Sequence, residues 1–184
     1  MKNVKALIIM DIQNDFCDGG PIPHKKSLEI IPTINKIKED YQHVFLVREL
    51  HQHNHSSFLE FGGKIHSHCV IDTQGAEFNT HLDISKSDII ITRGTLQKFD
   101  SASAFYDAEN INKPTNLRHL LQVNNITELY FCGINMDVSI FSTVLDAINY
   151  KYNCYIYKDC VAYADEEKYN NNMKYLESLG VIFI

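Results

Sequence analysis

Short β-branched runs alternate with longer segments of helical period along this chain, and this alternation is the feature that most limits its fold. The runs are apolar at consecutive positions, which is typical of strands covered on both faces. They span residues 5–10, 43–47, 88–92, 128–132, 155–158 and 181–184. Helices are expected at residues 27–40, 115–123, 137–150 and 165–179. The pattern predicts an α/β fold with a doubly wound, mostly parallel sheet, in one domain over residues 1–184.

Charge and composition exclude several classes of protein. A net charge of −6 offers no basic surface for nucleic acid. No apolar run reaches the roughly 18 residues of a membrane helix, and the first residues lack a signal-peptide pattern. The five Cys show neither metal-like nor disulfide-like spacing, which suits a reducing compartment. We expect a cytoplasmic protein that acts on a small molecule without nucleic-acid or membrane partners; homo-oligomer formation is left open.

Two long segments, residues 49–78 and 94–114, interrupt the alternation directly after predicted strands. Ligands bind at the carboxyl ends of strands in such sheets, so these segments are candidates for a site.

The first long segment holds five of the nine His. Glu49, His51 and His55 are spaced closely enough to converge on one ion, and His68 could complete the set. Imidazole and carboxylate together suit a divalent metal, with Zn²⁺ first and Mn²⁺ or Fe²⁺ as alternatives. The competing interpretation is a solvated His-rich loop that binds nothing. His53 and His66 are expected to be bystanders.

Three polar residues follow other predicted strands. Asp11 ends the first strand, and a buried carboxylate there is costly unless it is paired or used as a general acid or base. A capping role is the alternative, and Asp15 competes with it for either role. Ser139 lies where a strand gives way to a helix, whose N–H groups favour an anionic nucleophile or an oxyanion; it is a candidate nucleophile or a plain first-turn Ser. Arg93 ends the third strand as a fixed cation.

Several motifs together resemble the isochorismatase-like hydrolases, and within them the nicotinamidases. The opening ALIIMDIQNDFCDGG resembles the family's first strand with its catalytic Asp, and ELHQHNH from Glu49 is similar to the metal segment DWHPxNH. DSASAF at residues 100–105 resembles DSYSAF, and CGINMDVS at residues 132–139 resembles CGLATDYC. The stretch at residues 65–78 also matches the family pattern, and the resemblance covers essentially the whole chain.

The resemblance implies a six-stranded parallel sheet with a site at its carboxyl edge. It implies a cis peptide between Ile134 and Asn135, with the amides of Asn135 and Ser139 facing a substrate carbonyl. The implied catalytic positions are Asp11, Arg93 and Ser139. The implied metal ligands are Glu49, His51, His55 and His68. The implied pocket positions are Phe16, Ile65, Ala102, Phe105, Ile134 and Asn135.

The chain departs from the family pattern at five of these positions. Ser139 replaces the nucleophilic Cys, Arg93 replaces a Lys, and Glu49 replaces an Asp. Ile65 and Ala102 stand where the family has Trp and Tyr. An engineered Cys-to-Ser change would explain Ser139 alone and leave the other departures unexplained.

These departures leave two main hypotheses. The first is a metal-dependent amidohydrolase that converts nicotinamide, or a related small amide, to the acid and ammonia, with a role in pyridine nucleotide metabolism. Ser139 then needs a nearby base, for which Asp11 is the candidate, although pairing with Arg93 should make a carboxylate less basic. The alternative is a degenerate member that binds a small molecule or a partner without hydrolysis. Vinyl-ether hydrolysis, as in the isochorismatase branch, is disfavoured because that branch generally lacks the metal motif.

Overall fold

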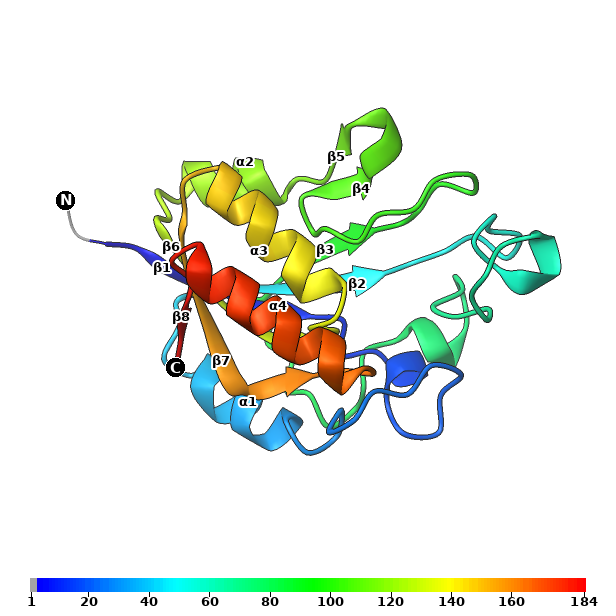
Figure 1. Ribbon diagram of the computed structural model, residues 1–184, viewed down its shortest axis with the longest axis horizontal. Helices are drawn as coiled ribbons and strands as arrows, with labels where there is room; N and C mark the ends of the chain where they lie inside the picture. Colours follow the sequence, from blue (N-terminus) through cyan, green and yellow to red (C-terminus); the bar gives the residue numbers. More distant parts are fainter. Residues whose placement is uncertain (1–2) are drawn as a thin grey trace.

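A six-stranded parallel sheet forms the centre of the computed structural model, which describes residues 3–184 (Figure 1). The strand order is β3-β2-β1-β6-β7-β8, so the chain winds outward from β1 in one direction and then in the other. The strands are β1 (Lys5–Met10), β2 (His43–Glu49), β3 (Ile89–Arg93), β6 (Glu128–Ile134), β7 (Asn153–Ala162) and β8 (Ile182–Phe183). The predicted doubly wound α/β fold is confirmed.

Helices cover both faces of the sheet (Figure 1). They are α1 (Ile31–Lys38), α2 (Leu117–Val123), α3 (Ser139–Asn149) and α4 (Glu166–Ser178). Leu7 and Ile9 of β1 belong to the apolar cluster that contains residues of α1. Ile8 and Met10 belong to the cluster built with α2, α3 and α4. Alternate residues of one strand are therefore buried on opposite faces, which explains why these strands are apolar at consecutive positions.

Several strands extend further than the sequence predicts. β2 continues to Glu49, which places this carboxylate on the strand instead of in the following loop. β7 continues past Lys158 and Asp159, two exposed residues whose polarity hides the rest of the strand from a pattern search. The second long segment contains a short antiparallel pair, β4 (Tyr106–Ala108) and β5 (Lys113–Pro114). Single 3₁₀ turns lie at Asn14–Phe16, Leu59–Phe61, Gln74–Ala76 and Glu109–Ile111.

The parallel register brings the predicted polar residues to one edge of the sheet. Glu49 and Arg93 are directly paired at the ends of β2 and β3. Asp11 follows β1, and Met10 is paired with Gly133 near the end of β6. No helix within residues 3–184 combines the length and the apolar character needed to cross a membrane.

Candidate active site

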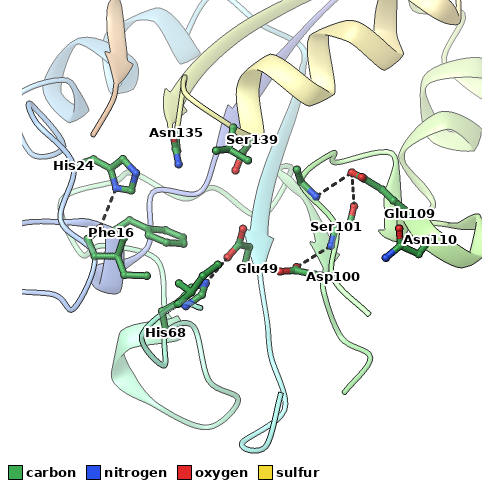
Figure 2. A pocket seen from close by; sticks show the side chains of 14 residues that line it. Phe16, His24, Glu49, His68, Asp100, Ser101, Glu109, Asn110, Asn135 and Ser139 are labelled. Carbon is green, nitrogen blue, oxygen red and sulfur yellow. Dashed lines mark hydrogen bonds and ion pairs between the residues drawn. The ribbon is translucent and has the colours of Figure 1, made fainter. Parts of the chain in front are cut away.

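A cavity of about 360 Å³ opens at the carboxyl edge of the sheet (Figure 2). Its walls come from the ends of the central strands, the start of α3 and both long segments. Six of its lining residues are Phe16, Glu49, His68, Ala102, Asn135 and Ser139.

Arg93 lies beneath this cavity with no exposed surface and contacts three functional groups. Its Nη2 atom lies 2.5 Å from Asp11 Oδ2 and 2.6 Å from Glu49 Oε1. The same nitrogen donates to Ser139 Oγ at 3.0 Å. Its Nη1 atom donates to the Ser101 carbonyl. One guanidinium thus pairs with two buried carboxylates and joins them to the start of α3, so that each buried charge has a partner.

Asp11 is more basic than an ordinary aspartate. Burial raises its pKa to about 6, and the charge of Glu49 adds to this effect, whereas Arg93 and a hydrogen bond from Ser139 oppose it. Pairing with Arg93 does lower the pKa of this carboxylate, as expected, but the loss of hydration on burial outweighs the attraction of the cation. Its Oδ1 atom has no hydrogen-bond partner among residues 3–184. Asp11 therefore holds a free lone pair at a pKa suited to proton transfer near neutrality.

Glu49, His51 and His68 direct three ligand atoms toward one point. Glu49 Oε2 lies 3.3 Å from His51 Nε2 and 3.1 Å from His68 Nε2. The Nδ1 atoms face backbone carbonyls, of Gly94 at 2.9 Å and of His66 at 2.8 Å. A carbonyl only accepts, so each neutral ring carries its proton on Nδ1 and presents an Nε2 lone pair to the carboxylate. Two nitrogen lone pairs and a carboxylate oxygen repel one another unless a cation lies between them. This set of donor atoms fits a divalent metal such as zinc.

Glu49 keeps its negative charge despite its burial. Burial alone would raise its pKa, but the positive charge of Arg93 holds that pKa well below the ordinary value. An ionised carboxylate beside two imidazole nitrogens is available as a metal ligand without first losing a proton.

His55 is turned away from this convergence point. Its Nδ1 atom accepts from the Ser57 backbone N–H at 3.3 Å, so its proton is on Nε2, which lies 3.1 Å from the Phe99 carbonyl. It joins His51 and Asp100 in a second group whose potential ligand atoms lie within 4.8 Å of one another. The structure thus gathers three of the four predicted ligands and places His55 in an adjacent group. Asp100 was missed, because a carboxylate some 45 positions further along the chain shows no spacing signal.

The turn before α3 presents backbone N–H groups to the cavity wall. The peptide between Ile134 and Asn135 is cis, as the resemblance implies. Among residues 3–184, neither the Asn135 nor the Ser139 N–H donates a backbone–backbone hydrogen bond. Ser139 is the first residue of α3, where the helix dipole is positive. These groups could stabilise a negative oxygen bound near Ser139.

The same turn is attached to α4 by hydrogen bonds. Asp137 Oδ2 accepts from the N–H groups of Ala164 and Asp165, at 2.7 and 2.9 Å. Asn172 Nδ2 of α4 lies 3.3 Å from the Met136 carbonyl and 3.1 Å from the Asp137 carbonyl, and donates to both. The position of Ser139 therefore depends on the docking of α4.

Four of the six predicted pocket residues line the cavity: Phe16, Ile65, Ala102 and Asn135. The Phe16 ring lies 5.6 Å from the His68 ring, between centroids. Ile65 is 40% exposed and Ala102 carries only a methyl group, so neither of these two lining positions supplies an aromatic ring.

Phe105 and Ile134 are not among the cavity-lining residues. Phe105 is 1% exposed and packs on Tyr150 in the core beside α3, at 5.1 Å between ring centroids. The Ile134 side chain is buried on the α1 face of the sheet. Both corrections have the same cause: a motif position indicates which segment approaches the cavity, and the local path of the chain decides which side chain faces it.

Two polar residues, the buried Gln13 and the half-buried Asp15, hold the backbone next to the site. Gln13 donates from Nε2 to the Glu49 carbonyl and accepts on Oε1 from the Glu49 N–H, both at 2.8 Å. Asp15 accepts from the Cys69 N–H at 2.6 Å, next to His68, so it anchors a loop and does not compete with Asp11. The role of Gln13 could not be predicted from the sequence, because an isolated amide forms no pattern.

His24 is a cavity-lining residue that sequence reasoning also missed. It lies outside both long segments and has no neighbouring His. The one feature of the sequence that could have indicated His24 is its position in the segment after β1, which leaves the sheet at its carboxyl edge.

Comparisons with known proteins agree with this geometry. The chain is 32% identical over 170 residues to the nicotinamidase of Acinetobacter baylyi, covering 84% of this chain and 79% of that protein. It is 29% identical over 196 residues to an Arabidopsis thaliana protein named a probable inactive nicotinamidase, covering 96% and 89% of the two chains. It superposes on the crystal structure of the pyrazinamidase of Pyrococcus horikoshii in complex with zinc with a TM-score of 0.89, at 31% identity and 98% coverage of both chains.

The model of the isochorismatase domain matches residues 5–184. This range includes every strand of the sheet and every residue that lines the cavity. A match of this extent shows that the chain belongs to the isochorismatase family.

Proposed function

We propose that this protein is a metal-dependent amidohydrolase that cleaves nicotinamide or a related small amide, with Ser139 as the nucleophile. The observation that carries the proposal is the state of Asp11, a buried carboxylate with a pKa of about 6 and a free Oδ1. Arg93 holds this carboxylate and Ser139 Oγ on the same nitrogen. A base, a hydroxyl and a fixed cation are thus in contact, as a serine nucleophile requires.

The reaction begins when Asp11 accepts the proton of Ser139 and Oγ attacks the amide carbonyl carbon. The carbonyl π electrons move to oxygen, and the N–H groups of Asn135 and Ser139 stabilise the resulting oxyanion. Asp11 returns the proton to the amide nitrogen, the C–N bond breaks, and ammonia leaves. Asp11 then takes a proton from water, and the water oxygen attacks the carbonyl carbon of the Ser139 ester. The bond between this carbon and Ser139 Oγ breaks, Asp11 returns the proton to Oγ, and the carboxylic acid leaves. Arg93 keeps its charge throughout and balances the negative groups around it.

Glu49, His51 and His68 would hold a divalent cation, with zinc as the first candidate. When bound, this ion supplies a Lewis-acidic centre that can take a ring nitrogen of the substrate and fix its orientation. The chain's own contribution is the orientation of the two imidazoles, which the Gly94 and His66 carbonyls set.

A second function, binding without hydrolysis, is favoured by one observation. Ser139 offers a hydroxyl, which is ionised far less readily than the thiol that the family pattern has there. One relative of this chain is itself named a probable inactive nicotinamidase.

Ammonia release from nicotinamide by the zinc-loaded protein separates the two functions. The proposal expects turnover by the native chain and a loss of at least roughly 100-fold in Ser139→Ala, as for removal of a nucleophile that needs its base. Ser142→Ala, on the same helix, is the matched control and should retain activity. Equal rates for native and Ser139→Ala proteins, together with a gain in Ser139→Cys, would establish the binding function instead.

A further inference from the structure

We propose that His24 is a specificity residue that accepts a hydrogen bond from the ligand, so that the preferred amide carries an amino or hydroxyl donor besides its carboxamide. This inference rests on the proposed function, because it assigns the substrate class of the same cavity.

His24 is a buried part of the cavity wall. His24 is only 2% exposed, and it is one of the residues that line the cavity. Figure 2 shows it beside Phe16 and Asn135, across the cavity from Asp100, Ser101 and Glu109. No part of the proposed reaction uses this ring.

The tautomer of His24 follows from the backbone carbonyl at its Nδ1 atom. Nδ1 lies 3.0 Å from the Ile22 carbonyl, which only accepts, so Nδ1 carries the proton. Nε2 then holds a lone pair, and no group within residues 3–184 donates a hydrogen bond to it. Burial lowers the pKa of this ring, which keeps it neutral near pH 7. His24 is therefore a hydrogen-bond acceptor without a partner in the cavity wall.

Phe16 relates His24 to the candidate metal site. The Phe16 ring lies 5.7 Å from the His24 ring and 5.6 Å from the His68 ring, between centroids. Figure 2 shows the two imidazoles on opposite sides of Phe16. A flat ligand packed on Phe16 with one edge toward His68 directs another edge toward His24. Ala102 also lines the cavity, and its small side chain leaves room for a ring substituent.

The identity of the preferred substituent follows from the cost of leaving an acceptor unpaired. Water can hydrogen-bond Nε2 in the empty cavity, but a bound ring that displaces this water must donate in its place or lose binding energy. Sites built to hydrogen-bond a substrate group discriminate strongly against analogues that lack it. An amino group and a methyl group have similar size, so the difference between them isolates the hydrogen bond.

The test compares amino-substituted nicotinamides with their methyl-substituted isosteres at each ring position, using ammonia release by the zinc-loaded protein. At one ring position, kcat/KM for the amino compound should exceed that for the methyl compound by about 5- to 10-fold, the usual effect of one hydrogen bond. In His24→Leu this ratio should fall to about one. His24→Gln, whose amide oxygen can accept, should restore part of it. Thermal unfolding confirms that each variant is folded.

Dissociation constants separate failure of this inference from failure of the proposed function. If no compound releases ammonia, the same amino-to-methyl ratio is measured by calorimetric titration, and a preference that depends on His24 upholds the inference. A ratio that is the same in native and His24→Leu proteins, or no ring position at which the amino compound is favoured, overturns it.

Discussion

Two groups of polar residues meet at Glu49, and they are held in different ways. The Arg93 centre, formed by Asp11, Arg93 and Ser139, lies at strand and helix ends and is joined by contacts between side chains. The histidine cluster, formed by His51, His55 and His68, lies on the long segment after β2 and is oriented mainly by backbone carbonyls. Sheet register therefore fixes the first group, whereas the path of a loop fixes the second.

Glu49 links the two groups through its two oxygens. Oε1 pairs with Arg93, and Oε2 faces His51 and His68. A substitution in one group should therefore also affect the other group. The effect should be larger when the substitution leaves more of the negative charge on Glu49 without a partner.

Replacement of Arg93 by Met should have the largest effect, because it leaves Asp11 and Glu49 buried without their cation. We expect a loss of about 3–5 kcal/mol in the free energy of unfolding, measured by urea denaturation of the metal-free protein. Arg48→Met is the matched control: Arg48 is half-buried on the same edge of the sheet, contacts Thr92, and should cost less than about 1 kcal/mol. Equal losses in the two variants would contradict the central role of Arg93.

Substitutions in the histidine cluster should change the amount of zinc that the protein binds. His51→Ala removes one of the three converging ligand atoms, and zinc affinity should fall by more than the roughly 10- to 100-fold that loss of an outer partner costs. Zinc per chain, measured by elemental analysis after dialysis, checks this. His53→Ala, at an exposed neighbouring position, should bind zinc like the native chain. Undiminished zinc in His51→Ala would disprove the assigned site.

The Arg93 centre should give the protein its pH dependence. The proposed base is Asp11 in its charged form, and its pKa is raised to about 6, so kcat/KM should fall about tenfold per pH unit below pH 6. Because this carboxyl binds a proton more readily in the folded chain, its contribution to stability should be full below its unfolded pKa of about 3.9 and be lost as the pH rises to about 6. A pH–rate profile of native protein shows the first effect, and Asp11→Asn should leave no activity above background. A flat profile between pH 5 and 7 would exclude Asp11 as the base.

The smallest effect is expected at the edge of the histidine cluster. Ser57 Oγ lies 2.7 Å from His55 Nδ1, and Ser57→Ala should cost about 1 kcal/mol of stability, the usual contribution of one hydrogen bond. Zinc affinity should change far less than in His51→Ala, because His55 lies outside the Glu49 group. A large loss of zinc in Ser57→Ala would instead place His55 in the same metal site.

The contrast between the two groups also explains what the sequence could predict. Strand β1 has the predicted bounds, and Asp11, Arg93 and Ser139 could be located because each follows an apolar run whose direction is set by the sheet. The spacing of His51 and His55 identified the segment but not their separate partners, since ring orientation depends on carbonyls such as those of Gly94 and Phe99.

Other features depend on contacts between distant parts of the chain. Phe105 belongs to a motif, yet the turn of the chain into β4 directs its ring to the core. His24 and Gln13 stand alone in sequence, and only the folded chain brings them to the cavity and to Glu49. Periodicity carries no information about such pairings.

The attachment of the turn before α3 to α4 has a consequence for how the protein is made. No residue of α4 lines the cavity, yet Ala164, Asp165 and Asn172 supply the donors that hold the turn carrying Ser139. These residues all follow α3 in the chain. A nascent chain that has completed β6 and α3 but not yet α4 therefore lacks the contacts that order its candidate active site, and the site can form only after α4 has been synthesised.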